Sequence, residues 1–133
     1  MELKVPSEIK IDGYIPTAED LTFTTNTSYS FSNDRFSWLF NNYDDIKIKS
    51  GGNSSYMFAY CYSITDLSNV SVTFPFSASN VTGMFQDCQK LKYFPRMSGN
   101  VESVYRMFYH CLAVEEFPDD FFDNLKLEDN YYA

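Results

Sequence analysis

The sequence contains little of the chemistry from which catalytic and metal sites are built. Its 133 residues include one histidine, His110, and three cysteines, one of which, Cys111, directly follows the histidine. Adjacent side chains point apart on a helix, and nucleophilic catalysis by a Cys-His pair also needs a third group that orients the base. A zinc site needs several such ligands that converge. We therefore expect no enzymatic activity, no cofactor and no metal site.

Basic residues and long apolar runs are also scarce. Ten basic residues against eighteen acidic ones give a net charge of −8, which repels nucleic-acid phosphate and anionic membranes. The longest uninterrupted apolar run, Tyr56 to Tyr62, is much shorter than the roughly 20 residues that span a bilayer. The first residues alternate polar and apolar and include Pro6, whereas a secretory signal needs a basic start and a continuous apolar stretch. We expect no nucleic-acid binding, no membrane insertion and no signal peptide.

What the sequence does contain is one phrase, Met-Phe-x-x-Cys, in three copies. The copies are Met57–Cys61, Met84–Cys88 and Met107–Cys111, and they hold all three cysteines of the chain. Four residues before each methionine stand Asn53, Asn80 and Ser103, residue types that accept hydrogen bonds from the free amides at a helix start. The steps between copies are 27 and 23 residues, within the range of leucine-rich repeats. The phrase therefore predicts a repeat protein.

The repeated side chains predict how each unit folds. Positions zero, one, four and seven of the phrase share one face of a helix, so Met84, Phe85, Cys88 and Leu91 are expected to be buried together over about two helical turns. The tail that follows, Leu-x-x-Phe-Pro at residues 91–95, is predicted to be the strand. One unit cannot bury its own apolar face, so units stack and their side chains form a continuous core with free, buried thiols. The predicted structural ladder consists of Met57, Phe58, Cys61, Met84, Phe85, Cys88, Leu91, Met107, Phe108 and Cys111.

Two segments, GMFQDCQKLKYFP and RMFYHCLAVEEFP, resemble the BspA-like leucine-rich repeat family. A third segment, YMFAYCYSITDLS, is similar but lacks the final proline. The resemblance implies an α/β fold, a short leucine-rich-repeat-like solenoid with one short strand and one short helical turn per coil. An earlier, altered copy is assigned to WLFNNYDDIKIKS, with Leu39 and Phe40 in place of the Met-Phe pair. The solenoid is then expected over residues 35–133, with copies near 35–50, 53–68, 80–95 and 103–118.

Residues 1–34 show a different pattern. Apolar residues alternate with polar ones, as at Ile9 and Ile11 and again at Leu21 and Phe23, which is typical of strands. We expect a small N-terminal β element at 1–34. It would cap the first coil, dock the solenoid onto a larger assembly, or do both, because the end of a repeat stack must be covered.

The abundance of aromatic residues points to binding. Thirteen phenylalanines and eleven tyrosines exceed what three or four narrow coils can bury, so some must face outward. Exposed tyrosines offer a flat apolar face and a polar tip, which suit sugars and protein hot spots. The alternative is that they stack on one another along the solenoid. The candidate binding residues, which lie between ladder positions, are Tyr60, Tyr62, Tyr93, Tyr105 and Tyr109.

These observations favour a non-enzymatic binding or structural module. The resembling cellular proteins are mostly exported to the surface, whereas a phage particle is released by lysis without a signal peptide. We therefore expect a virion protein, such as a fibre or decoration, or a cell-surface adhesin. Its partners would be other structural proteins or a host-surface protein or glycan, and it could assemble as a homo-oligomer. The alternative is a cytoplasmic scaffold for protein-protein interactions, in which the cysteines stay reduced.

Overall fold

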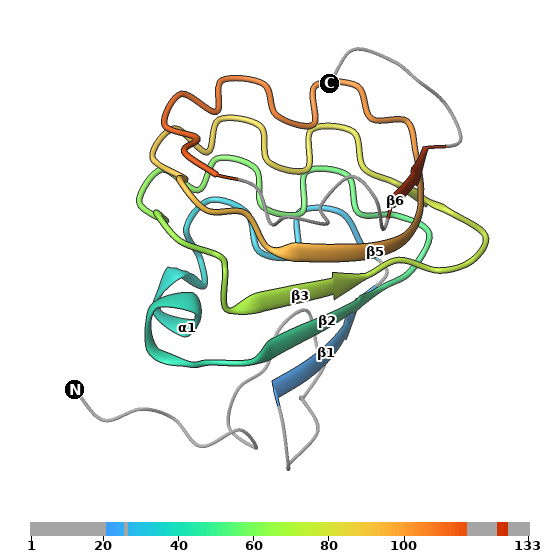
Figure 1. The fold of residues 1–133 in the computed structure, drawn as a ribbon, viewed down its shortest axis with the longest axis horizontal. Coiled ribbons are helices and arrows are strands. Elements are labelled where there is room, and N and C mark those ends of the chain that lie inside the picture. The colour runs from blue at the N-terminus through green and yellow to red at the C-terminus, as the bar shows by residue number, and fades with distance from the viewer. Residues whose placement is uncertain (1–20, 26, 117–124, 128–133) are drawn as a thin grey trace.

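The computed structural model describes residues 21–25, 27–116 and 125–127. In these ranges the chain winds into a parallel β-solenoid of about three turns (Figure 1). The predicted repeat solenoid is thus confirmed. Its elements are β1 (Leu21–Thr25), α1 (Ser37–Asn42), β2 (Ile46–Ser50), β3 (Val70–Thr73), β4 (Ser79–Asn80), β5 (Arg96–Glu102) and β6 (Leu125–Leu127). Within the described residues, no helix is long and apolar enough to span a membrane.

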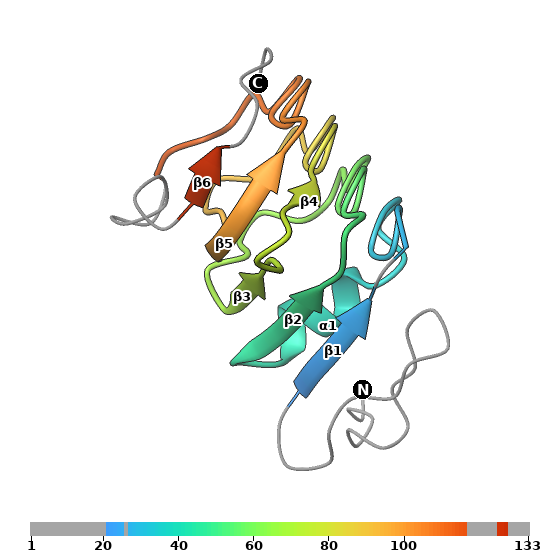
Figure 2. The same ribbon diagram turned by 90° about the vertical axis from the view of Figure 1, so that its right-hand side faces the viewer.

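One wall of the solenoid is a parallel sheet. Strands β1, β2, β3 and β5 pair in that order, β4 and β6 also pair with β5, and every pairing is parallel (Figure 2). Burial alternates along the strands, so Ile46 and Ile48 of β2 point inward while Lys47 and Lys49 face solvent. This period of two follows from the pleat of a strand. The predicted strand at Leu21 and Phe23 is confirmed as β1.

The opposite wall, which we call the turn wall, consists of residues 29–34, 54–61, 81–88 and 104–111. It carries the Met-Phe-x-x-Cys phrases, and its segments appear as stacked wavy lines in Figure 1. The prediction that these phrases form helical turns is wrong. Each segment is a chain of tight turns, closed in the Met57 copy by hydrogen bonds from Met57 N to Ser54 O (3.1 Å) and from Ala59 N to Tyr56 O (3.1 Å).

The reason is that the amides of the turn wall bond between coils instead of along a helix. Phe58 N donates to Met84 O (2.8 Å), and Phe85 N donates to Met107 O (2.9 Å). To direct these amides and carbonyls towards the neighbouring coils, the backbone takes positive φ at the residue before each methionine and at the third residue after it. The first coil, which has Ser30 in place of the methionine, follows the same pattern. These left-handed positions are Tyr29, Asn33, Tyr56, Tyr60, Gly83, Asp87, Arg106 and His110.

Two of the predicted helix caps serve these turns. Asn53 Oδ1 accepts a hydrogen bond from Ser55 N (3.1 Å), and Asn80 Oδ1 accepts one from Thr82 N (2.9 Å). Such a bond to the backbone two residues on is the usual way in which asparagine initiates a turn. The asparagine side chains therefore accept hydrogen bonds from backbone amides as predicted, but at the start of turns and not at the start of helices.

The segment Leu-x-x-Phe-Pro is not a strand either. Within the copy at 91–95, Tyr93 forms single bridges to Asp66 and Glu116 of the neighbouring coils. The strands begin only after this segment, at Val70 in β3 and at Arg96 in β5. Leu91 and Phe94 are buried, so the apolar residues of the segment contribute to the core without forming a ladder of strand hydrogen bonds.

The first coil lies earlier in the chain than predicted. Phe31 N donates to Met57 O (2.8 Å), which aligns Ser30-Phe31 with the Met57-Phe58 pair at a step of 27 residues. Leu39 and Phe40, assigned above to that pair, lie in α1 and are buried. Residues 21–34 thus belong to the solenoid and not to a separate element. Residues 1–20 and the predicted end of the solenoid at 117–124 and 128–133 lie outside the described residues.

The start of the turn wall is closed by one side chain. In each later coil, the main-chain carbonyls at the methionine position and two residues after it accept amides from the preceding coil. In the first coil these carbonyls belong to Ser30 and Ser32. The guanidinium of Arg35 donates to both, from Nη2 to Ser30 O (2.9 Å) and from Nε to Ser32 O (3.2 Å), and also to Tyr29 O. Arg35 therefore acts as an end cap.

The core between the walls is an aromatic ladder. Phe31, Phe58, Phe85 and Phe108 stack in sequence, with ring centroids 5.4, 5.4 and 6.0 Å apart and interplanar angles of 17° or less. Met57, Met84 and Met107 are buried beside them. All ten predicted ladder residues face this core, with Phe108 and Cys111 of the last described coil only partly buried.

Candidate functional site

The cysteines hold neighbouring coils together. Each thiol donates a hydrogen bond to the carbonyl of the phenylalanine in the coil before it: Cys61 Sγ to Phe31 O (3.2 Å), Cys88 Sγ to Phe58 O (3.0 Å) and Cys111 Sγ to Phe85 O (3.1 Å). All three thiols are free. A small apolar side chain with a weak donor suits this position, because Cys61 and Cys88 are almost fully buried.

The surroundings of the thiols disfavour the thiolate. The neighbouring Cys61 thiol and burial raise the pKa of Cys88, and burial raises the pKa of Cys111 to about 12. A protonated thiol is a poor nucleophile and a poor metal ligand. The one histidine, His110, pairs instead with Asp87, with Nδ1 and Oδ1 3.0 Å apart. No group of three or more metal-ligating residues is found in the described ranges.

Three of the five candidate tyrosines, Tyr60, Tyr105 and Tyr109, belong to the turn wall, and Tyr62 directly follows its second segment. Tyr62, Tyr105 and Tyr109 are 48%, 42% and 39% exposed, and Tyr60 is half-buried. Tyr60 and Tyr62 lie near each other, with ring centroids 6.5 Å apart. Tyr105 and Tyr109 belong to the last described coil, two coils farther along the turn wall.

The fifth candidate, Tyr93, lies apart from the turn wall. It stands in the segment that leads from the turn wall to β5, and its hydroxyl donates to Glu115 Oε2 (3.0 Å). This hydrogen bond raises the pKa of Tyr93. Tyr93 therefore links two coils through its side chain and does not extend the surface formed by the others.

A second group of tyrosines, Tyr29 and Tyr56, lies at the other end of the turn wall and is not among the residues predicted from the sequence. Tyr29 and Tyr56 stack with centroids 5.0 Å apart and planes within 8°. The ring of Tyr56 extends over Gly83, where an added Cβ would lie 2.5 Å from Tyr56 Cε1. Both tyrosines directly precede the methionine position, so the spacing of the repeat would have revealed the pair once Ser30 was aligned correctly. These two rings form a ladder along the surface, as the alternative interpretation holds.

The last described coil gathers four side chains that we call the Tyr–Arg cluster: Tyr105, Arg106, Tyr109 and His110. The Arg106 guanidinium carbon lies 5.2 Å from the Tyr105 ring centroid and 4.7 Å from that of Tyr109. Tyr109 also stacks on His110 with centroids 3.9 Å apart. Cation–π contacts of this kind hold exposed rings in place. All four side chains are exposed.

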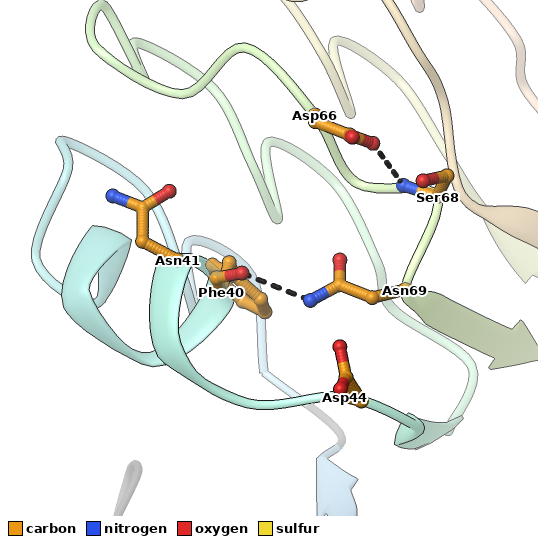
Figure 3. Close-up of a pocket in the computed structure, with 6 residues that line it drawn as sticks. All are labelled: Phe40, Asn41, Asp44, Asp66, Ser68 and Asn69. Carbon is orange, nitrogen blue, oxygen red and sulfur yellow. Dashed lines mark hydrogen bonds between the residues drawn. The ribbon is translucent and has the colours of Figure 1, made fainter. Parts of the chain in front are cut away.

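A separate hollow of ≈300 Å³ lies beside α1, lined by Phe40, Asn41, Asp44, Asp66, Ser68 and Asn69 (Figure 3). The Asn69 amide donates to Phe40 O (2.9 Å) and Tyr43 O (2.6 Å), which satisfies carbonyls at the end of α1. Asp66 Oδ1 accepts a hydrogen bond from Ser68 N (2.8 Å). These polar groups secure α1 against the next coil, so their arrangement is explained by the fold.

The turn wall and its Tyr–Arg cluster are accordingly the best candidate for a functional surface. Comparisons with protein-family models, with curated proteins and with solved structures find no match to this chain. The candidate site therefore rests on the geometry of the turn wall.

Proposed function

We propose that the chain is a non-enzymatic binding module of the BspA-like leucine-rich repeat type, and that its turn wall recognises a protein or a glycan. The observation that carries this proposal is the Tyr–Arg cluster, where the exposed rings of Tyr105 and Tyr109 lie 5.2 and 4.7 Å from the Arg106 guanidinium carbon. Tyrosine and arginine are enriched among residues that dominate binding energy.

The physical support is that the rings are held in place before a ligand arrives. A side chain that is already ordered loses less conformational entropy on binding, which increases affinity. The inter-coil hydrogen bond from Asp87 N to Tyr109 O (2.8 Å) fixes the backbone beneath the cluster. A rigid surface that presents aromatic rings suits the flat apolar face of a sugar or an apolar side chain of a protein.

The proposed setting is a virion, as a fibre or decoration protein, or a cell surface, as an adhesin. Partners would be structural proteins of the same particle or a protein or glycan of a host surface, and the chain could act as a homo-oligomer. A cytoplasmic interaction scaffold is the second candidate, favoured by thiols that remain free. Mass spectrometry of virions, envelope and cytosol from the producing culture separates these settings, because enrichment in virions supports the first and recovery only from cytosol supports the scaffold.

The binding role is tested with Tyr105→Ser/Tyr109→Ser on a glycan array and on intact host cells. We expect the double variant to lose at least about tenfold in affinity, as removal of two hot-spot rings does. The control is Tyr93→Ser, which makes the same exchange away from the turn wall and should retain binding. Equal binding by the wild type and the double variant would contradict the proposal for this surface.

A further inference from the structure

The Arg106 guanidinium of the Tyr–Arg cluster has no polar partner in the described part of the chain. Its contacts are with two rings, those of Tyr105 and Tyr109, whose centroids lie 5.2 and 4.7 Å from the guanidinium carbon. Among the described residues, none forms an ion pair or a side-chain hydrogen bond with Arg106. A guanidinium has five N–H donors, and an aromatic ring provides no lone pair for them. These donors are therefore available to a ligand.

Arg35 shows how an arginine of this chain serves the fold. Its guanidinium donates to the backbone carbonyls of Tyr29, Ser30 and Ser32 and so closes the start of the turn wall. Arg106 makes no such bond to a described residue, although its side chain is exposed and is held by two rings. A role in stability therefore accounts for Arg35 but leaves the donors of Arg106 unexplained.

The charge around Arg106 favours a ligand with few negative charges. Segments 81–88 and 104–111 of the turn wall contain one carboxylate, Asp87. It lies 3.0 Å from His110 Nδ1, and its side chain is only 16% exposed. The chain as a whole carries a net charge of −8, which repels polyanions. The planar fork of arginine matches a single carboxylate with two parallel hydrogen bonds, so the site suits one isolated carboxylate.

The surroundings of the cluster suit a sugar better than a protein. In the preceding coil, the positions of the first three cluster residues carry Thr82, Gly83 and Gln86, none of which is aromatic. The rings thus do not continue as one apolar patch, whereas a protein interface covers about 800 Å² per partner around an apolar centre. The amide of Gln86, which has no described partner, instead offers donors and an acceptor to hydroxyl groups.

We propose that the Tyr–Arg cluster binds a glycan through a sugar whose ring carries a carboxylate, such as a uronic or sialic acid. The carboxylate accepts two hydrogen bonds from Arg106 while the sugar ring lies against Tyr105 or Tyr109. In such a sugar the carboxylate is bonded directly to the ring, so one sugar makes both contacts. This inference rests on the proposed function and specifies the ligand class of the same site.

An acidic side chain of a protein is the competing carboxylate, and it fits the cluster less well. The carboxylate of aspartate or glutamate stands at the end of a flexible chain that has no ring. It would engage Arg106 but leave the exposed faces of Tyr105 and Tyr109 uncovered. Ordering a flexible side chain also costs conformational entropy, which a carboxylate fixed to a sugar ring does not lose.

The test measures the affinity of the full chain for matched pairs of glycans on an array. Each glycan that ends in glucuronic or sialic acid is printed beside the same glycan with its carboxylate reduced to an alcohol. We expect the wild type to bind the carboxylated member at least about tenfold more tightly, as expected for charge-assisted hydrogen bonds. Arg106→Gln, which removes the charge and the fork, should reduce this preference to about one.

The matched control is Arg96→Gln, which makes the same exchange at an exposed arginine of the sheet wall. It should keep the wild-type preference. Equal loss of preference in the two variants would overturn the inference, because the effect would then be one of overall charge. Equal affinity of the wild type for both members of a pair, or tighter binding of a sulfated counterpart, would also overturn it. If Arg106→Gln weakened binding of both members by the same factor, Arg106 would only support the rings, and the inference would be wrong.

Failure of this inference can be told from failure of the proposed function. Suppose that the wild type bound no glycan but bound host cells, and that protease treatment of the cells or Tyr105→Ser/Tyr109→Ser abolished this binding. The ligand would then be a protein, which would refute the carboxylated sugar and leave the proposed function intact. Unchanged binding by Tyr105→Ser/Tyr109→Ser would contradict the proposed function and, with it, this inference.

Discussion

Both walls of each coil bury apolar side chains in the core, but with different patterns of residues. The sheet wall is formed by strands whose inward residues vary between coils, such as Phe23, Ile48, Val72 and Met97, and no repeated phrase is visible there. The turn wall repeats methionine, phenylalanine and cysteine at fixed positions. The sheet tolerates variation because a regular strand ladder accepts many apolar side chains, whereas the turn wall does not.

The difference teaches where a solenoid needs a fixed sequence. Non-glycine residues such as Tyr56, Asp87 and Arg106 adopt left-handed backbone in the turn wall, and this conformation costs about 1 kcal/mol or more per residue. The stacked phenylalanines and the thiol hydrogen bonds offset that cost. The repeat in the sequence therefore marks the wall whose backbone has the least intrinsic stability.

The largest expected effect comes from a charge placed in the thiol ladder. Cys88→Asp buries a carboxylate beside Phe58 O, and an uncompensated buried charge lowers the free energy of unfolding by about 3–5 kcal/mol or prevents folding. Thr73→Asp places the same group on the exposed side of β3 and should cost about 1 kcal/mol or less. Denaturant unfolding measures both variants. Equal unfolding free energies for Cys88→Asp and Thr73→Asp would contradict the view that the thiol ladder excludes a charge that the exposed side of β3 accepts.

Leucines on the turn-wall side provide the next comparison. Leu91 is fully buried, so Leu91→Ala should reduce the free energy of unfolding by about 2–5 kcal/mol. Leu112 is 75% exposed and serves as the control, with an expected change within about 0.5 kcal/mol. Thermal and chemical unfolding report both values. An unchanged melting temperature for Leu91→Ala together with Cys88→Asp would contradict the stacked-coil structure.

Two glycines, one in each wall, sharpen the comparison. At Gly99 in β5, φ is +108° and an added Cβ would meet Phe74 O at 2.3 Å, so Gly99→Ala should cost about 2–3 kcal/mol. At Gly83 in the turn wall, the obstacle is the Tyr56 ring, which can rotate, and Gly83→Ala should cost about 1–2 kcal/mol. Unfolding free energies of both variants test this order.

The control for both glycines is Gly52→Ala. No atom lies within 4 Å of the Cβ that would be added there, and φ is not in the left-handed region. Its stability should equal or slightly exceed that of the wild type. A greater loss at Gly83 than at Gly99 would mean that the Tyr29–Tyr56 stack is stiffer than its position at the surface suggests.

The thiols should make stability depend on alkaline pH. Because the folded pKa of Cys111 is raised to about 12 from a reference of 9.0, the folded state keeps its proton where the unfolded state loses it. This contribution is complete below pH 9 and decreases as the pH rises from 9 towards 12. Unfolding free energies between pH 8 and 11 should fall more steeply for the wild type than for Cys111→Ser. Parallel pH dependences of the unfolding free energy for the two proteins would show that burial does not raise the pKa of the Cys111 thiol.

The smallest expected effect belongs to the outer sheet face. Lys49→Ser/Arg96→Ser replaces side chains that contribute to no part of the core, so the free energy of unfolding should change by no more than about 0.5 kcal/mol. Circular dichroism during heating checks this. A larger decrease in the free energy of unfolding would show that these cations stabilise the sheet. It would contradict the view that the sheet wall accepts substitutions at its exposed positions.

The repeat and its apolar residues could be predicted from the sequence, whereas the backbone of the repeat could not. Positions zero, one and four fall on one side of a helix and equally on one side of consecutive four-residue turns, so Met84, Phe85 and Cys88 are buried in either case. The deciding feature is positive φ at Asp87 and similar residues, which composition does not indicate. Tertiary hydrogen bonds between coils selected the turns.

The position of the first coil is not evident from the sequence for a related reason. Ser30 occupies the methionine position and Asp34 the cysteine position, so only Phe31 keeps the phrase. Leu39-Phe40 resembles a Met-Phe pair more closely than Ser30-Phe31 does. The sequence therefore favours an alignment of the phrase with residues that lie in α1. Among the candidate binding residues, Tyr105 and Tyr109 are exposed on the turn wall, as their spacing predicts. Arg106 lies between them in the sequence, and its role is not predictable because a single charge has no periodicity.

The end cap formed by Arg35 bears on how copies of this chain meet. In a head-to-tail contact, the His110 amide of one copy, which donates to no described carbonyl, would have to meet Ser32 O of the next, the acceptor in the equivalent register. Arg35 already occupies that carbonyl and its neighbour at Ser30. A heterologous contact that does not close produces filaments. One guanidinium thus occupies the two main-chain carbonyls that such a head-to-tail contact would use.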